Sequence, residues 1–109
     1  MVDKPMIVAE ISVVPVGTGS TSLSEYVAAA TQALEGIRGL DHDLTPMGTV
    51  LQSPDLQPIL EAVRAVHDAL FEMGLERIVT DLKIDDRRDV ERTATRKMES
   101  VRNKLIRKR

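Results

Sequence analysis

The chain of 109 residues contains no cysteine and no tryptophan, and it has one tyrosine and one phenylalanine. The lack of cysteine excludes disulfides, thiolate nucleophiles and cysteine-ligated metal centres. The scarcity of aromatic rings leaves almost no material for stacking on nucleic-acid bases. No apolar run approaches the roughly 20 residues that a membrane span needs, and residues 1–5 are too few and too polar for a signal peptide. We therefore expect a cytoplasmic protein that does not insert into a membrane.

Basic residues are scarce over most of the chain and concentrated at its end. Residues 1–86 carry five lysine and arginine residues against fourteen acidic ones, whereas residues 87–109 carry ten against three, so the net charges are −9 and +7. Because no aromatic residues are interleaved with the basic ones, this segment argues against a nucleic-acid partner and favours a solvated face or an acidic protein surface. The length fits one small domain, so we expect residues 1–109 to form a single domain.

Alternation of apolar and polar residues predicts a first strand over residues 6–16. Its expected core face carries Ile7, Ala9, Ile11 and Val13. A helix is expected next, because Ser22 and Glu25 stand three residues apart, as in a capping box, ahead of apolar residues at helical spacing. Gly36 and Gly39 predict its end.

Two short extended segments within residues 40–53 are interrupted at Pro46, which predicts a hairpin or a bulged bend. Ser53 and Pro54 then suit the cap and first turn of a second helix, which Gly74 ends. The expected apolar stripe of this helix is Leu56, Ile59, Leu60, Val63, Val66, His67 and Leu70.

A last strand is predicted over residues 75–84, followed by a third helix. The expected stripe of that helix is Val90, Ala94, Met98, Val101 and Leu105. Between them lie Asp85, Asp86, Arg87, Arg88 and Asp89. They are interpreted as a cap for the third helix plus surface ion pairs, and the alternative is an acidic and basic site.

The order strand, helix, strand, strand, helix, strand predicts a split βαβ, or ferredoxin-like, α+β fold: a four-stranded antiparallel sheet with two helices on one face and an added C-terminal helix. The residues of the other face mix apolar and charged types too evenly for a plain solvent face. We expect a second copy of the chain to cover it, aided by the C-terminal helix, so the protein is expected to be a homo-oligomer.

Catalytic groups are few. His67 lies on an apolar stripe and is interpreted as a core or interface residue, and His42 alternates with two aspartates that cannot readily converge on one metal. Without cysteine, a recognisable triad or a metal cluster, we expect neither an enzyme nor a metal site. Glu10 is more informative, because an acidic side chain within a central strand needs either an ion-pair partner, such as Lys83 or Arg77, or a ligand.

Glycines and hydroxyls gather between the first strand and the first helix, at residues 17–24. The glycines allow a sharp exit from the strand, and the hydroxyls and main-chain amides at a helix N-terminus suit a small polar or anionic group. Thr49, after the proline bend, adds another hydroxyl. The alternative is that these residues only cap the helix and shape the turn.

Four ordered motifs resemble the thiamine-binding protein family. They are residues 10–18 (EISVVPVGT), 22–27 (SLSEYV), 44–49 (LTPMGT) and 83–89 (KIDDRRD). The resemblance covers roughly residues 6–105. It implies a ferredoxin-like fold, homodimers or homotetramers built through the sheets, and binding of thiamine or its hydroxymethylpyrimidine part, with no catalysis and no cofactor other than this ligand.

Matching positions imply a pocket and residues near it. The pocket candidates are Ser12, Thr18, Ser22, Ser24, Tyr26 and Thr49, with Glu10, Asp81 and Lys83 nearby. Similar sequences often carry an acidic residue and a glycine where this chain has Gln52 and Ser53. If that acid holds the cationic thiazolium, this chain should bind thiamine weakly or prefer the bare pyrimidine.

Two functions follow from these observations. The first is a binding protein for thiamine or its pyrimidine part, serving vitamin B1 transport, salvage or sensing. The alternative is a structural or regulatory oligomer whose partner is another protein, which the charge asymmetry favours.

Overall fold

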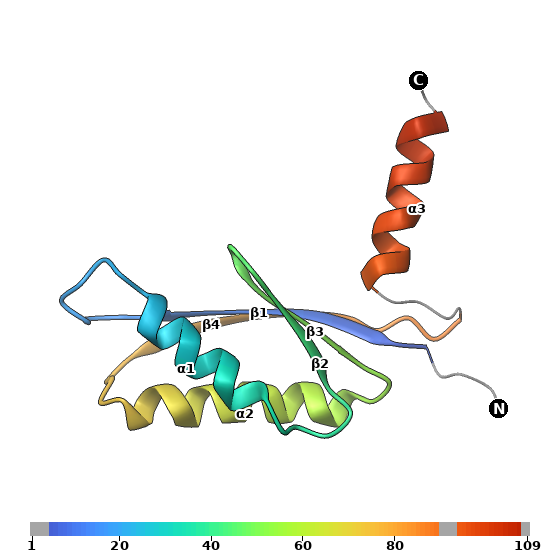
Figure 1. Ribbon diagram of the computed structural model, residues 1–109. Coiled ribbons are helices and arrows are strands. Elements are labelled where there is room, and N and C mark those ends of the chain that lie inside the picture. The colour runs from blue at the N-terminus through green and yellow to red at the C-terminus, as the bar shows by residue number, and fades with distance from the viewer. Residues whose placement is uncertain (1–4, 90–93, 108–109) are drawn as a thin grey trace.

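The computed structural model describes residues 5–89 and 94–107. The elements in chain order are β1 (Ile7–Pro15), α1 (Ser24–Leu34), β2 (Asp41–Thr45), β3 (Gly48–Ser53), α2 (Leu56–Glu72), β4 (Ile78–Asp85) and α3 (Ala94–Arg107). The strands form one antiparallel sheet in the order β2-β3-β1-β4 (Figure 1). The predicted ferredoxin-like α+β arrangement is therefore confirmed.

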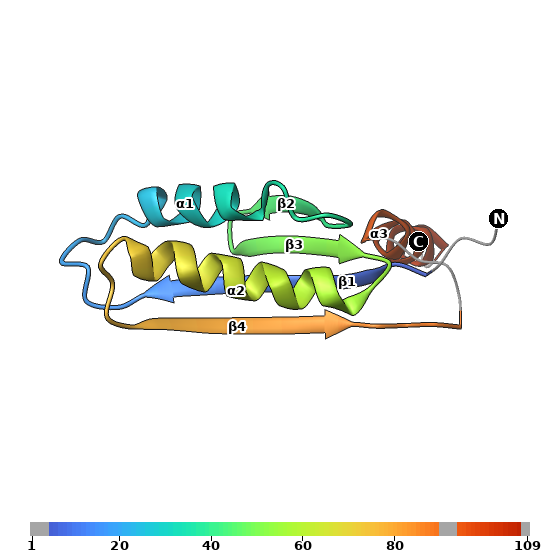
Figure 2. The same cartoon turned by 90° about the horizontal axis from the view of Figure 1, so that it is seen from below.

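Helices α1 and α2 lie side by side over one face of the sheet (Figure 2). The core between the layers comes from alternate residues of β1, from β3 and from the two helices, as strand alternation and helical spacing require. Its buried apolar members are Ile7, Ala9, Ile11, Leu34, Leu51, Ile59, Ala62, Val66 and Leu70. The predicted core face of the first strand is confirmed, with Val13 partly buried against this cluster.

The start of α1 differs from the prediction. The helix begins at Ser24 with Leu23 at the N-cap, and no side chain caps it. The predicted capping box is therefore wrong. The hydroxyl of Ser22 instead lies 3.3 Å from that of Ser24, because the polar side chains of this loop bond to one another. The predicted end is confirmed, since Gly36 takes a φ of 91° just beyond the helix.

The start of α2 is also later than predicted. Ser53 is the last residue of β3, and its hydroxyl accepts the N–H of Asp55, the N-cap residue, at 3.1 Å. The predicted stripe is wrong at Leu56 and Leu60, which are exposed, and it omits Ala62. Ala62 is fully buried because it lies three residues after Ile59, whereas Leu60 lies on the flank and is 46% exposed.

Asp85 and Asp86 do not lie at the start of a described helix. Asp85 ends the strand and residues 86–89 are not helical, so the predicted cap by Asp85 and Asp86 is wrong. The predicted surface ion pairs are confirmed, with Arg87 2.6 Å from Asp89 and Arg88 2.9 Å from Asp86. The expected stripe residue Val90 lies outside the described residues.

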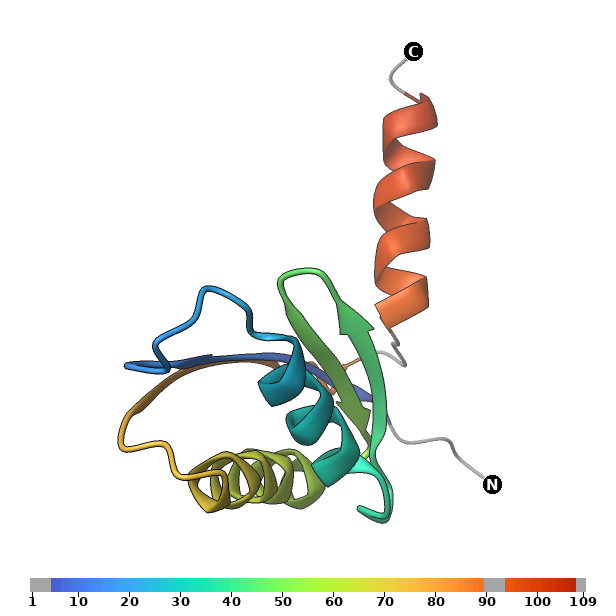
Figure 3. The same ribbon diagram turned by 60° about the vertical axis from the view of Figure 1, so that its left-hand side comes forward.

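Helix α3 projects from the sheet on the side opposite α1 and α2 (Figures 1 and 3). The apolar side chains described on it are all exposed: Met98, Val101, Leu105 and Ile106. The sheet face on the same side exposes Val14 and Val79, each nearly half accessible. Within the described part of the chain, this helix and this face therefore lack the apolar partner that the core face has.

We predict that Ile59→Ala lowers the free energy of unfolding by about 2–5 kcal/mol, because it leaves a cavity in the core. Leu60→Ala, its neighbour on the exposed flank of α2, should cost about 1 kcal/mol or less. Urea unfolding followed by circular dichroism measures both. Equal losses for the two variants would contradict the packing described for α2.

Candidate functional site

A cavity of about 300 Å³ lies where the ladder between β1 and β3 ends. β1 pairs with β3 as far as Ile11, opposite Thr49, but it pairs with β4 as far as Pro15, opposite Ile78. Residues 12–15 of β1 consequently have a strand neighbour on one side alone. Figure 1 shows the β2–β3 hairpin diverging from β1 toward its tip, so the sheet opens there.

The cavity is bounded by the end of β1, by α1 and the residue before it, and by the hairpin tip, with α2 contributing at its base. Its lining residues are Ile11, Ser12, Val13, Val14, Pro15, Leu23, Tyr26, Val27, Ala30, Leu34, Leu44, Pro46, Met47, Gly48, Thr49, Val66 and Leu70. Residues from both faces of β1 belong to this set. The cavity therefore occupies the opening in the sheet rather than one face alone.

The lining is mainly apolar, with hydroxyls on Ser12, Tyr26 and Thr49. Among the described residues that line it, none carries a charge. Burying a full charge there would be costly without a partner, whereas a flat, neutral, polar-edged ring would lose little. The volume is at the lower end of small-molecule pockets, roughly 300–1,000 Å³, and suits a single heterocycle.

Exposed apolar side chains surround the mouth of the cavity. Met47 at the hairpin tip is 83% exposed and Leu44 beside it is 56% exposed. Leu23, at the N-cap of α1, and Val27, within α1, also contribute and are exposed. Methionine is flexible and polarisable, so Met47 can adapt to the surface of an apolar ring.

Three of the nine predicted site residues meet at this cavity. Thr49 is buried on β3, Tyr26 is half-buried on α1, and Ser12 comes from β1. They are brought together from three elements that are distant in the sequence. Tyr26 is the single tyrosine of the chain and supplies the one phenol ring of this lining.

The predicted hydroxyl residues of the loop before α1 do not line the cavity. The hydroxyl of Thr18 donates to the carbonyl of Ser20 at 2.8 Å and accepts the N–H of Ser20 at 3.2 Å. The hydroxyls of Ser22 and Ser24 contact each other. Gly17 and Gly19 take φ of 80° and 75°, as the sharp turn requires. These hydrogen bonds fit the alternative that the loop residues shape the turn.

Glu10, Asp81 and Lys83 lie on the exposed face of the sheet. Glu10 is opposite Lys83 in the β1–β4 register, yet no ion pair within 4.0 Å joins them in the described part of the chain. Glu10 lies above Gly48, where a Cβ would be 3.4 Å from its Cγ. It therefore reaches the hairpin near the cavity, although it does not line it.

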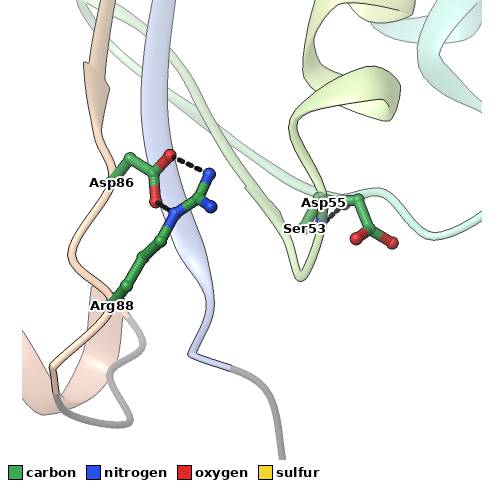
Figure 4. Close-up of polar contacts among 4 residues, drawn as sticks. All are labelled: Ser53, Asp55, Asp86 and Arg88. Atoms are coloured by element: carbon green, nitrogen blue, oxygen red, sulfur yellow. Dashed lines mark hydrogen bonds and ion pairs between the residues drawn. The ribbon is translucent and has the colours of Figure 1, made fainter.

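A second cavity of about 250 Å³ lies at the start of α2 and is more polar. Arg88 donates two hydrogen bonds to Asp86 there, at 3.1 and 2.9 Å (Figure 4). The hydrogen bond from Arg88 holds the pKa of Asp86 below its usual value, and the pKa of Arg88 is raised in turn. The cation and the carboxylate of this pair thus satisfy each other on the exposed surface, and the lining also includes the carboxylate of Asp55.

The histidines have structural surroundings. His67 Nε2 is 2.7 Å from the hydroxyl of Thr80, and its ring contacts Phe71 edge to face. This arrangement agrees with its interpretation as a packing residue. Within residues 5–89 and 94–107, no three histidine or acidic side chains form a group that could hold a metal ion.

Reasoning from the residues missed the apolar half of the cavity. Leu23, Leu44 and Met47 contribute to it, and none of them was predicted as a site residue. The available signal was an apolar side chain at the tip of a two-residue hairpin turn, where polar residues are usual. An exposed apolar residue at such a turn, here Met47 beside Pro46, indicates a surface that contacts a ligand or another protein.

Relatives of the chain share its sequence and its fold over nearly the full length. A protein from Methanothermobacter thermautotrophicus is 49% identical over 100 residues, which are 92% of this chain and 100% of that one. The crystal structure of a hypothetical protein from Methanocaldococcus jannaschii is 38% identical, with a TM-score of 0.79 over 88% of this chain and 95% of that one.

A Thermotoga maritima protein provisionally assigned to thiamine biosynthesis or salvage has the same fold, with a TM-score of 0.71 at 23% identity, over 89% of this chain and 99% of that one. None of the helices described here is long and apolar enough to cross a membrane. The family model described as thiamine-binding protein matches residues 9–102, which include every residue that lines the cavity. The chain belongs to the thiamine-binding protein family.

Proposed function

We propose that this protein binds thiamine or its hydroxymethylpyrimidine part in the cavity between β1, α1 and the hairpin tip, and that it does so without catalysis. The observation that carries the proposal is an uncharged, mainly apolar cavity with three hydroxyls in a chain of this family. The role is that of a cytoplasmic binding protein in vitamin B1 transport, salvage or sensing.

The lining supports the pyrimidine ring as the part that is bound. The ring of Tyr26 offers a stacking surface, and the hydroxyls of Thr49 and Ser12 can donate or accept hydrogen bonds at the edge of a heterocycle. The thiazolium of thiamine carries a positive charge, and the described lining holds no carboxylate to balance it. We therefore place the thiazolium at the mouth, near Met47, and expect the free pyrimidine to bind at least as well as thiamine.

The exposed face of the sheet and α3 support self-association. Both are partly apolar and lie on the same side of the molecule. The described part of α3 is also basic, whereas the body of the chain is acidic, so α3 of one copy is attracted to the body of another. We propose a homodimer or homotetramer assembled through the sheet faces and α3.

The same observations favour a second candidate function, a structural or regulatory oligomer whose partner is another protein. The exposed stripe on α3 is the specific feature, because an amphipathic helix without an apolar partner is a common docking element. In this case the cavity would not respond to thiamine compounds, and the two functions are thereby distinguished.

Thermal-shift titration with thiamine, hydroxymethylpyrimidine and thiamine phosphates tests the binding proposal. A ligand at about 100 times its Kd adds about 2.7 kcal/mol to stability, which raises Tm by about 10 °C or more for a chain of this size. Tyr26→Ala should weaken hydroxymethylpyrimidine binding by about tenfold or more through lost stacking, and Thr49→Val by up to about tenfold through a lost hydrogen bond.

Thr31→Val is the matched control for Thr49→Val. Its hydroxyl donates to the carbonyl of Val27 within α1, and Thr31 does not line the cavity. The control should keep the full ligand response. A flat response of the wild-type protein to every compound at millimolar concentration would contradict the binding proposal.

Removal of residues 94–109 should lower the number of chains per assembly, obtained from light scattering as the measured mass divided by the mass of one chain, because it deletes the exposed apolar stripe and most of the basic segment. Val101→Asp combined with Leu105→Asp should have the same effect while the chain keeps its full length. The assembly should also weaken at high salt, since screening reduces attraction between surface charges. An unchanged number of chains per assembly in both variants would exclude α3 from the assembly.

A further inference from the structure

The main chain of β1 has an unusual position at the cavity. Central strands of a sheet are normally hydrogen-bonded on both sides. Here the β1–β3 ladder stops at Ile11, and Val13 would next face Met47, which already belongs to the hairpin turn. Val13 is half-buried and lines the cavity.

The direction of the main-chain groups follows from the pairing with β4. The N–H of Val16 donates to the carbonyl of Arg77 at 3.0 Å, so Val16 directs its main chain toward β4. Each residue of an antiparallel strand directs both its N–H and its C=O to the same side, and the next residue directs both of its groups to the opposite side. Val14 therefore also bonds toward β4, and Val13 directs both of its groups toward the opening.

Two further observations agree with this direction. A Cβ on Gly48 would lie 2.9 Å from the carbonyl oxygen of Ile11, which places that oxygen on the β3 side, as the same alternation requires. Pro15 has no N–H, and proline within a strand is tolerated where its nitrogen faces away from a ladder. Pro15 lies two residues after Val13 in β1, so its main chain faces the same side as that of Val13. Its nitrogen therefore faces the opening rather than β4.

The N–H and C=O of Val13 consequently form a donor and acceptor pair on the cavity wall. In residues 5–89 and 94–107, no strand lies opposite this pair, and no turn or loop hydrogen bond reaches it. Main-chain groups in an apolar wall need a partner, because leaving them unpaired costs free energy. At the cavity, β1 therefore exposes a hydrogen-bonding edge that a neighbouring strand would otherwise occupy.

We propose that the main-chain N–H and C=O of Val13 form hydrogen bonds with the bound ligand, and that the site selects planar heterocycles with a ring-nitrogen acceptor beside an amino donor. This inference rests on the proposed function and deepens it. The edge of an aminopyrimidine has this pattern: its ring nitrogen accepts from the N–H, and its amino group donates to the C=O. Side-chain hydroxyls can either donate or accept, so they do not distinguish a donor from an acceptor on the ligand. A main-chain N–H can only donate and a C=O can only accept, so this pair does distinguish them.

Proline substitution tests the direction of the main chain without any ligand. Val13→Pro removes an N–H that faces the opening, so the variant should fold with a Tm close to that of Val13→Ala. Val14→Pro is the matched control, because it removes an N–H from the β4 ladder and should prevent folding or lower Tm strongly. Equal damage from the two proline substitutions would overturn the inference.

Calorimetric titration with 4-amino-5-hydroxymethyl-2-methylpyrimidine tests the recognition. Val13→Pro should bind it about tenfold more weakly than Val13→Ala, since one hydrogen bond to the ligand is lost. On the wild-type protein, the analogues with hydrogen or dimethylamino in place of the amino group should also bind about tenfold more weakly.

The outcomes separate the inference from the proposed function. If the wild-type protein binds the aminopyrimidine but Val13→Pro binds it as well as Val13→Ala does, Val13 does not read the ligand and the proposed function stands. If the analogues bind as tightly as the parent, the selection for a donor beside an acceptor is overturned. If the wild-type protein binds none of these compounds, both the inference and the proposed function are wrong.

Discussion

β1 is paired with β3 and β4 as far as Ile11, and with β4 alone as far as Pro15. The reason is that the β2–β3 hairpin turns at Pro46 and Met47 before β1 ends. Had β3 begun two residues earlier in register with β1, the sheet would be continuous and the cavity would be filled by strand pairing. The central strand instead supplies both the core face that anchors α2 and the exposed edge at the cavity. The position of one turn thus determines where a small molecule can be accommodated.

The order and type of the elements could be predicted from the sequence, because period-two alternation around Ile7 to Val13 and helical spacing around Ile59 to Leu70 are local patterns. Helix ends were predictable for the same reason, since Gly36 and Gly74 take positive φ just after α1 and α2. Helix starts were not. Ser22 and Ser53 have the composition of N-caps, but each uses its hydroxyl on a residue two positions away, and propensity does not distinguish these uses.

The candidate site was predictable only in part, and the reason is again physical. Ser12, Tyr26 and Thr49 lie in motifs that the resemblance picked out, so their positions were proposed before any geometry was known. Leu44 and Met47 line the cavity because of a register between strands that are about 40 residues apart, which no local pattern encodes. The loop hydroxyls had the right chemistry for a ligand, yet they satisfy one another.

Gly48 lies directly against β1, where even a methyl group would be within 2.9 Å of the carbonyl oxygen of Ile11. A side chain at this position could not be accommodated by rotating it away, because the contact is with main chain rather than with a flexible group. The hairpin would have to tilt outward about its base. Because residue 48 is a glycine, the hairpin can lie close to β1. Its lack of a side chain therefore limits the width of the opening between the hairpin and β1, and with it the thickness of a ring that can enter.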